Sequence, residues 1–283
     1  MHLIQLFSFI FAFKKVMAQL KFQSFGSGSS GNCYFIGNSN YGFLIDAGIG
    51  IRNIKKYLYN IGLNFENILG VFITHDHVDH IKSVGVLGEK YYIPIFTTKK
   101  VHEGIQKSSY VNKNLTFSKK IIEKWESITI EDFCFTAFPV SHDATDSVGY
   151  VVIYQEKKFV FATDLGYISN EIITYLTDAN YLVLEANYDE KMLWDGSYPF
   201  YLKERIASDT GHLSNDQAGI FLSENYQEKL KNIFLCHLSK ENNLPTIAYN
   251  TVQKHLENNK IIVGKNVQLN VLERIHPSNI FIF

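Results

Sequence analysis

The sequence is poor in cysteine, has no excess of either charge, and lacks long apolar runs. Only three of its 283 residues are cysteines, and they lie in separate regions without a C-x-x-C pair. An odd, dispersed set argues against a disulfide framework and favours a reducing, cytoplasmic location. With 27 basic and 28 acidic residues the net charge is −1, so any site for a polyanion must be a local patch.

An apolar stretch, residues 3–13, lies near the start of the chain and is too short to span a bilayer. Lys14 and Lys15 follow this stretch, whereas a signal peptide carries its basic residues first. We therefore expect residues 1–16 to be an upstream extension without stable membrane association, and residues 17–283 to form one domain. A short membrane-surface anchor is the alternative for the extension.

Apolar runs of strand length alternate with helical periodicity along the rest of the chain. Strands are predicted at 20–25, 32–37, 41–45, 69–73, 93–97, 128–130, 133–138, 148–154, 158–162, 181–184, 233–235 and 267–272, with an edge strand at 280–283. Helices are predicted at 51–61, 81–88, 99–107, 168–176, 190–208, 214–223 and 245–257. Since no linker or repeat interrupts this order, we expect an α/β fold of two sheets with helices outside them.

The densest group of metal-ligand side chains is the segment 74–80, Thr-His-Asp-His-Val-Asp-His, directly after an apolar strand. Imidazole and carboxylate are the ligands that borderline divalent cations prefer. An extended segment that winds onto a helix would let His75 and His77 share one metal and turn Asp79 and His80 toward a second. A histidine-rich surface loop is the alternative, but five potential ligands at this spacing rarely coincide by chance.

Four further ligand-type residues share one context, the end of an apolar strand. They are Asp46, His142, Asp164 and His237. A strand end holds its side chain rigidly and projects it into the cleft above the sheets, where a metal site needs it. Each residue alone could be capped or solvated, but together with segment 74–80 they form a candidate metal site.

In order and rough spacing these residues resemble the five motifs of the metallo-β-lactamase superfamily, and the resemblance covers residues 20–283. It implies a four-layer αβ/βα sandwich of two mixed sheets, with two divalent ions bound between the sheet edges. Zinc is the expected ion because the site is rich in histidine, and manganese is the alternative because carboxylates also suit it.

The resemblance also assigns a role to each ligand. The first metal would be held by His75, His77 and His142, and the second by Asp79, His80 and His237. Asp164 would bridge the two ions, and Asp46 would support a ligand without binding metal. An aspartate in the bridging position favours a phosphoesterase, since the lactamases tend to use cysteine there.

Three finer motifs resemble the YycJ/WalJ-type branch of the superfamily: Ser27–Cys33 (SGSSGNC), Gly211–Asn215 (GHLSN) and His237–Asn243 (HLSKENN). That branch is associated with double-strand DNA exonuclease activity and is similar to the RNase Z and RNase J nucleases. The resemblance therefore implies a nucleic acid substrate, with DNA favoured over RNA.

Glu185 ends a predicted strand, and His212 precedes the predicted helix 214–223. In RNase Z-like enzymes a Glu and a His in similar motifs form a relay that protonates the leaving oxygen, and a histidine oriented by a carboxylate suits that task. With Asp79 they would complete the catalytic residues. The alternative is that His212 only caps the helix, with Ser214 or Asn215 as the N-cap.

Six residues are candidates for substrate contacts: Ser27, Ser29, Ser30, Asn32, Ser214 and Lys240. The Gly/Ser run 26–31 is predicted to be a tight turn whose backbone N–H groups could touch a phosphate, although plain turn chemistry also explains it. Lys240 could equally be a solvated surface residue.

The predicted function is metal-dependent phosphodiester hydrolysis, most specifically by a DNA exonuclease. A thioester or lactone hydrolase of the glyoxalase II type would use the same metal ligands, and an RNA-processing nuclease or a metal-dependent scaffold are further alternatives. A thiolate leaves without a proton donor, so the Glu185–His212 pair favours nucleic acid as the substrate.

Overall fold

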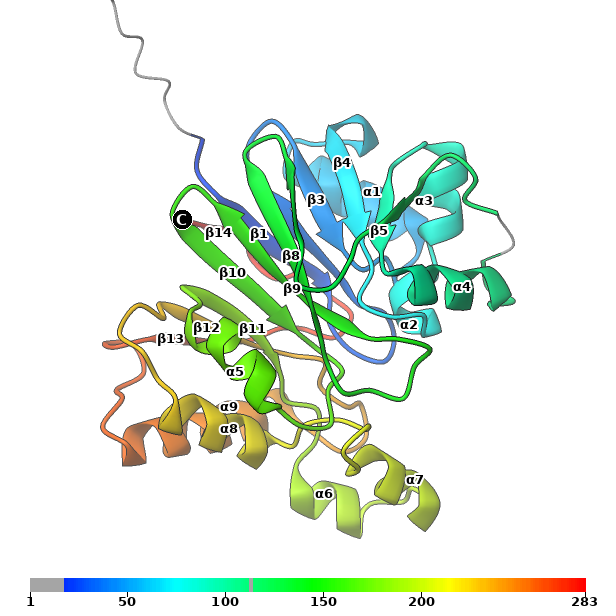
Figure 1. Ribbon diagram of the computed structural model, residues 1–283. Helices are drawn as coiled ribbons and strands as arrows, with labels where there is room; N and C mark the ends of the chain where they lie inside the picture. Colours follow the sequence, from blue (N-terminus) through cyan, green and yellow to red (C-terminus); the bar gives the residue numbers. More distant parts are fainter. Residues whose placement is uncertain (1–17, 112–113) are drawn as a thin grey trace, which may run out of the picture.

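Two seven-stranded sheets face each other, and helices cover their outer faces (Figure 1). This computed structural model describes residues 18–111 and 114–283. The extension predicted for residues 1–16 lies outside them. The arrangement confirms the predicted four-layer αβ/βα sandwich. Within the described ranges no helix is long and apolar enough to cross a membrane.

The first sheet has the strand order β14-β1-β2-β3-β4-β5-β6. Its strands are β1 (Lys21–Gly26), β2 (Cys33–Gly37), β3 (Gly42–Ile45), β4 (Ile68–Phe72), β5 (Ile95–Thr97), β6 (Lys119–Ile121) and β14 (Phe281–Ile282). Four helices pack on its outer face: α1 (Ile51–Asn60), α2 (Val78–Ile81), α3 (Val84–Lys90) and α4 (Lys99–Lys107). A 3₁₀ turn, Phe65–Asn67, leads into β4.

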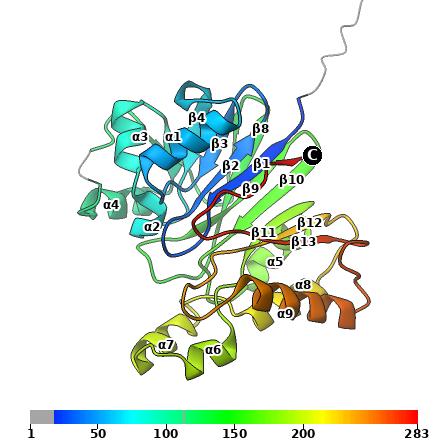
Figure 2. The ribbon, with the colours of Figure 1, turned by 180° about the vertical axis from the view of Figure 1, so that it is seen from behind.

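The second sheet has the order β13-β12-β11-β10-β9-β8-β7. Its strands are β7 (Ser127–Ile130), β8 (Phe133–Pro139), β9 (Val148–Tyr154), β10 (Lys157–Ala162), β11 (Tyr181–Glu185), β12 (Asn232–Cys236) and β13 (Gln268–Val271). Its outer face is covered by α5 (Asn170–Thr177), α8 (Asn215–Glu224) and α9 (Pro245–Asn258). Figure 2 shows the two helical layers on opposite sides of the molecule.

The central strands are apolar along their whole length because both of their faces are buried. In β12, Ile233 and Leu235 point into the core under the helices, while Phe234 points into the core between the sheets. The core between the sheets is rich in phenylalanine, and the rings of Phe72 and Phe135 stack across it with centroids 3.9 Å apart. Period-2 alternation between polar and apolar residues is therefore absent from these strands.

The structure differs from the predicted elements at three points. The predicted helix 190–208 is two short helices, α6 (Glu190–Asp195) and α7 (Phe200–Ile206), with Pro199 as the N-cap of α7. The predicted helix 81–88 is likewise divided between α2 and α3. Strand β6 was not predicted, because three exposed residues are too short to show a period.

The carboxyl ends of several strands meet at one edge of the sandwich. Strands β3, β4 and β5 run parallel in the first sheet, and β10, β11 and β12 run parallel in the second. Strand β8 shares the direction of β10, because both are antiparallel to β9. The residues at or just after these ends therefore gather in one place, and they include every candidate metal ligand.

Candidate metal centre

At the edge where the candidate ligands gather, the backbone is unusual just after three strands. Asp46, Asp164 and His237 have φ values of 60°, 56° and 53°, in the left-handed region that residues other than glycine rarely adopt. Such a conformation costs about 1–3 kcal/mol and persists only where the surrounding structure enforces it. These three residues follow β3, β10 and β12, so three of the nine described non-glycine residues with positive φ lie at the edge where the sheets meet.

Asp46 fixes the geometry of segment 74–80. Its Oδ1 accepts the backbone N–H of Thr74 at 2.9 Å, and its Oδ2 accepts Nδ1–H of His80 at 2.7 Å. Both side chains of the Asp46–His80 pair are fully buried. With Nδ1 bonded to Asp46, Nε2 of His80 faces Asp79 and Asp164. This is the supporting position expected for Asp46.

The first ligand cluster consists of His75, His77 and His142, whose ligand atoms lie within 4.8 Å of one another. Nε2 of His142 faces Nδ1 of His77 at 3.2 Å, while Nδ1–H of His142 donates to the carbonyl of Gly211 at 3.0 Å. Burial lowers the pKa values of His75 and His142. Both rings are therefore held neutral, the form that binds metal.

The second cluster consists of Asp79, His80 and His237, again within 4.8 Å. Oδ2 of Asp79 lies 3.6 Å from Nε2 of His80 and 3.5 Å from Nε2 of His237. Burial alone would lower the pKa values of both histidines. Asp164 and the neighbouring carboxylates outweigh it, raising the pKa of His80 well above its usual range and that of His237 to about 10. The surrounding carboxylates thus favour positive charge at this position.

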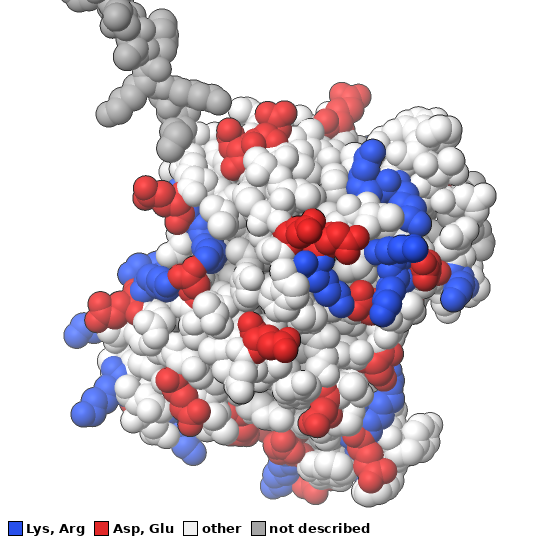
Figure 3. All heavy atoms as spheres, viewed as in Figure 1, with Lys and Arg blue, Asp and Glu red and all other residues white. Residues whose placement is uncertain are grey.

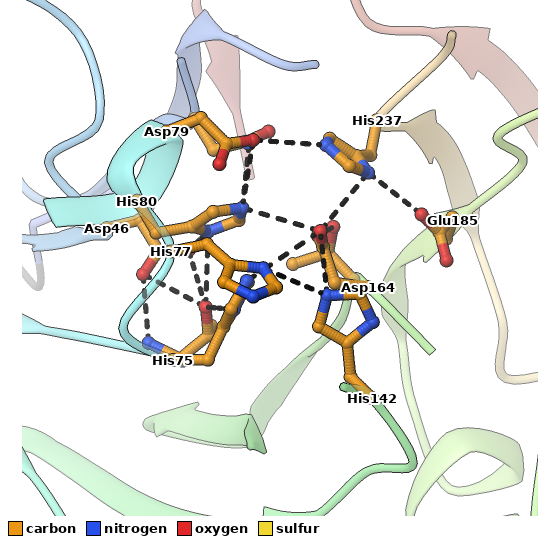
Figure 4. A network of polar contacts seen from close by, with 12 residues as sticks. Asp46, His75, His77, Asp79, His80, His142, Asp164, Glu185 and His237 are labelled. Atoms are coloured by element: carbon orange, nitrogen blue, oxygen red, sulfur yellow. Dashed lines mark hydrogen bonds and ion pairs between the residues drawn. The ribbon is translucent and has the colours of Figure 1, made fainter. Parts of the chain in front are cut away.

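Asp164 lies between the two clusters (Figure 4). Its Oδ2 is 3.8 Å from Nε2 of His142 in the first cluster and 3.5 Å from Nε2 of His80 in the second. Burial would raise its pKa, but His237 and His80 outweigh that effect and hold the pKa well below its usual range. A buried, ionised carboxylate in this place can reach a cation bound to either cluster.

The chemistry of the site fits a divalent cation. Nε2 of His75 and Nε2 of His237, one in each cluster, are buried and have no hydrogen-bond partner among residues 18–111 and 114–283. Leaving such an atom unsatisfied costs about 1–3 kcal/mol, so a partner that accepts its lone pair is expected. Imidazole nitrogens and carboxylate oxygens together form the donor set of a borderline divalent cation.

Glu185, the last residue of β11, joins this site to His212. Its Oε1 accepts Nδ1–H of His212 at 2.7 Å and Nδ1–H of His237 at 2.8 Å. Its Oε2 accepts the backbone N–H groups of Leu165 at 2.9 Å and Leu213 at 3.3 Å. Burial would raise the pKa of Glu185, but His212 outweighs it and lowers that pKa.

His212 lies at the border between the site and solvent. Its ring centroid is 5.1 Å from that of His142 and 5.2 Å from that of His237, and 17% of its side chain is exposed. With Nδ1 bonded to Glu185, its Nε2 is available to a molecule in the cleft. His212 is not the cap of α8, because Ser214 has that role.

The structure argues against two of the predicted substrate contacts. Ser27 is buried, and its Oγ accepts the backbone N–H of His237 at 2.9 Å and pairs with the hydroxyl of Tyr34. Ser214 is buried as the N-cap of α8, where its Oγ accepts the backbone N–H of Gln217 at 3.1 Å. Both hydroxyls therefore support the scaffold and are not free to meet a substrate.

The other four candidates lie where a substrate could reach them or close to the ligands. Asn32 is buried, and its Nδ2 lies 2.9 Å from Nε2 of His80. Ser29 and Ser30 are exposed on a turn. The turn is closed by a hydrogen bond from the N–H of Gly31 to the carbonyl of Gly28. Lys240 is exposed, and its Nζ lies 3.3 Å from Oε1 of Glu241. Their contacts with a substrate remain a prediction.

Two charged residues beside the site were not predicted. Nε of Arg205, on α7, donates to Oδ2 of Asp143 at 2.6 Å, and Oδ1 of Asp143 lies 3.6 Å from Nε2 of His142. Asp143 directly follows His142, so its position could have been noticed in the sequence. Arg205 gave no signal, because only the tertiary placement of α7 brings it here.

Similar proteins were found at the level of family, sequence and structure. A sequence model described as "Beta-lactamase superfamily domain" matches residues 41–231. Exodeoxyribonuclease WalJ of Streptococcus pneumoniae is 36% identical over 244 residues, which cover 86% of this chain and 91% of that protein. Exodeoxyribonuclease YycJ of Bacillus anthracis is 32% identical over 261 residues, which cover 92% of this chain and 98% of that protein.

Among solved structures, the metallo-β-lactamase fold protein YhfI from Bacillus subtilis superposes with a TM-score of 0.69. It is 17% identical, and the match covers 94% of this chain and all of that chain. At that identity the likeness concerns the fold alone.

Proposed function

The chain belongs to the metallo-β-lactamase superfamily and groups there with exodeoxyribonucleases, and on that premise we propose that it is a metal-dependent DNA exonuclease. The observation that carries the proposal is the bond between Glu185 and His212 at the margin of the ligand clusters. The alkoxide released from a phosphodiester is a poor leaving group, so its departure benefits from a positioned proton donor.

The ligand clusters would hold two divalent cations, with zinc as the first candidate and manganese as the second. The first would lie among His75, His77 and His142, the second among Asp79, His80 and His237, with Asp164 in reach of both. Bound there, the cations supply Lewis-acid activation of water and of the scissile phosphate.

The chain's own residues then act on protons and on position. His212 donates a proton from Nε2 to the departing oxygen, and Oε1 of Glu185 holds Nδ1–H so that the ring keeps one orientation. Asp79, with 18% of its side chain exposed, lies on the solvent side of the second cluster, where an attacking water enters.

Asn32 would serve the same site from the other side. Its Nδ2 lies 3.4 Å from Oδ2 of Asp79 and 2.9 Å from Nε2 of His80, so it can donate to an oxygen bound near the second cluster. The exposed Ser29 and Ser30 on the neighbouring turn, and Lys240, would meet flanking phosphates.

The test of this proposal offers several substrates to the full chain loaded with zinc or manganese. Linear double-stranded DNA, single-stranded DNA, an RNA, bis(4-nitrophenyl) phosphate and a glutathione thioester are compared in parallel. The variant His75→Ala/His77→Ala is the negative control. The matched control is His255→Ala/His276→Ala, which removes two histidines outside the site.

We expect metal-dependent shortening of DNA from its ends by the wild type and by the matched control, and none by the negative control. Cleavage of RNA in preference to DNA would show that the substrate is RNA, and it would leave the proposed phosphodiester hydrolysis unchanged. Hydrolysis of the thioester with no cleavage of any nucleic acid would contradict the proposal and favour a hydrolase of the glyoxalase II type.

A further inference from the structure

The helices α6 and α7 project beyond both sheets, at the end of the molecule away from the start of β1 (Figure 1). They lie between β11 and His212 in the sequence, and α7 returns to the metal centre through Arg205. A small cavity between α7 and the site is lined by Arg205, Gly211 and His212, among others. His212 and the guanidinium group of Arg205 therefore line the same small cavity.

Arg205 keeps most of its hydrogen-bonding capacity. Its Nε is bonded to Asp143, but in the part of the chain that the structure describes no hydrogen bond joins its two terminal amino groups to another residue. More than half of its side chain is exposed, 54%. A planar guanidinium group with free N–H groups in an open place suits a phosphate, which it can bind in a bidentate manner.

Tyr201 lies on the same face of α7 as Arg205, because residues four apart are neighbours on a helix surface. Its side chain is 72% exposed, so burial in the fold does not account for the ring. The two residues are separated by about one helical turn, ~5.4 Å along the axis. A phosphate and the base of an adjoining nucleotide can span that separation, and exposed aromatic rings are the usual platform for an unpaired base.

The face that carries Arg205 and Tyr201 is held in place before any ligand arrives. The buried Lys203 donates from Nζ to the carbonyl of Trp194 at 2.7 Å, which ties α7 to α6. Asp143, the partner of Arg205, is itself anchored by its backbone N–H to the carbonyl of Thr210 at 3.0 Å. A preorganised surface loses less conformational entropy on binding.

We propose that α7 is a nucleotide-binding surface for the strand on the leaving-group side of the scissile bond, where Arg205 binds a phosphate and Tyr201 stacks on an unpaired base. This inference rests on the proposed nuclease function and adds to it the means of holding a strand end. The charge distribution agrees with a contact of this local kind. In Figure 3 most of the face is uncharged, Lys and Arg gather over the part of the molecule that carries α4, and at the end that carries α6 and α7 they are mixed with Asp and Glu.

Binding can be measured apart from cleavage with a fluorescent DNA whose linkages are phosphorothioates that resist hydrolysis. The DNA is a duplex with a single-stranded end, and the full-length, metal-loaded protein is titrated by fluorescence anisotropy at several salt concentrations. Arg205→Gln should weaken binding about tenfold and lower the slope of log Kd against log salt by about one. Arg205→Lys should keep the slope while recovering only part of the affinity.

Tyr201→Ala should weaken binding about tenfold without changing the salt slope, because stacking releases no counterions. The matched controls lie on α1: Arg52→Gln removes another exposed arginine, and Tyr59→Ala removes a ring that is 80% exposed. Both controls should leave the affinity and the salt slope unchanged.

Asp143→Asn separates this proposal from a purely structural role for Arg205. If Arg205 only anchored α7 to the loop at Asp143, Asp143→Asn and Arg205→Gln would weaken binding equally, and the proposal would be overturned. If Arg205 binds phosphate, Asp143→Asn leaves the cation in place and an amide oxygen that can still accept the Nε–H of Arg205, so it should weaken binding far less than Arg205→Gln does.

The remaining outcomes distinguish this inference from the proposed function. DNA cleavage by the wild type with unchanged affinity in Arg205→Gln and Tyr201→Ala would overturn the inference and leave the nuclease function intact. If the variants bind DNA as predicted but the wild type cleaves no nucleic acid, the result would support the nucleotide-binding surface on α7 and contradict the proposed nuclease function. If the wild type neither binds nor cuts DNA, both are wrong.

Discussion

Asp46 and Glu185 are fully buried carboxylates at the ends of strands in opposite sheets, and each orients one histidine of the second ligand cluster. Asp46 bonds Nδ1 of His80 at 2.7 Å, and Glu185 bonds Nδ1 of His237 at 2.8 Å. They differ in their other partners. Asp46 is otherwise bonded to Thr74, inside the core, whereas Glu185 is also bonded to His212 at the edge of the cleft.

This difference separates two uses of the same chemistry. A carboxylate that bonds a ligand and a buried hydroxyl fixes the geometry of the site and nothing more. A carboxylate oxygen shared between a candidate ligand and a histidine at the cleft would couple a bound metal to the proposed proton donor. Replacing each carboxylate by its amide should therefore affect metal binding in both cases and catalysis in only one.

The largest effect is expected for Glu185→Gln. All four groups around Glu185 are donors, so the amide N–H₂ of glutamine has no acceptor there. DNA cleavage at saturating metal should fall by about 10²–10⁴-fold, and metal affinity by about 10–100-fold. Steady-state kinetics and chelator competition measure the two losses. The control is Glu241→Gln, which changes an exposed glutamate on the loop after His237. An unchanged rate of DNA cleavage in Glu185→Gln would contradict the account.

His212→Ala should lose the proton donor and keep the metals. DNA cleavage is expected to fall by about 10²–10⁴-fold, whereas hydrolysis of bis(4-nitrophenyl) phosphate should fall far less because nitrophenolate leaves without a proton. Metal content, measured on the purified protein, should match that of the wild type and of the control His276→Ala. An equal loss on both substrates would refute proton donation by His212.

Asp46→Asn should reduce metal affinity by about 10–100-fold and leave DNA cleavage near the wild-type rate once metal is saturating. The hydroxyl of Thr74 can rotate to accept from the new amide, so asparagine is accommodated better here than glutamine is at position 185. Metal titrations of the rate give both quantities. A defect that persists at saturating metal would show that Asp46 does more than orient His80.

The smallest effect is expected for Ser214→Ala. Loss of the N-cap of α8 should lower the free energy of unfolding by about 1 kcal/mol, with no change in KM for DNA, because the hydroxyl is buried. Urea denaturation and initial rates provide the measurements. The matched variant Ser30→Ala, on the exposed turn, should leave the free energy of unfolding unchanged. A raised KM for DNA in Ser214→Ala would show that Ser214 contacts the substrate.

The fold and the gathering of the candidate ligands could be predicted from the sequence for the same physical reason. Strands buried on both faces are continuous apolar runs. A His or Asp at the end of such a run therefore lies at the edge of the sheet where the carboxyl ends of the parallel strands gather. Even the break in the predicted helix 190–208 has a local cause, since Pro199 cannot continue a helix from the preceding turn. Its position was missed because the apolar pattern continues on both sides of it.

Contacts between distant parts of the chain could not be predicted. Ser27 lies in a Gly/Ser run that is predicted to be a tight turn, but its partner is His237, 210 residues away. Arg205 reaches the site only because α7 folds back onto the loop that carries Asp143. Sequence patterns report which face of an element is buried, and they carry no signal for a single bond of this kind.

The central claim is that Glu185 acts on the reaction through His212, and a double-mutant cycle tests it most directly. Rates of DNA cleavage at saturating metal are compared for Glu185→Gln, His212→Ala and the double variant. If the two residues form one proton-donating unit, the double variant should be about as slow as His212→Ala alone. If the two losses multiply, Glu185 and His212 act independently, and the account is contradicted.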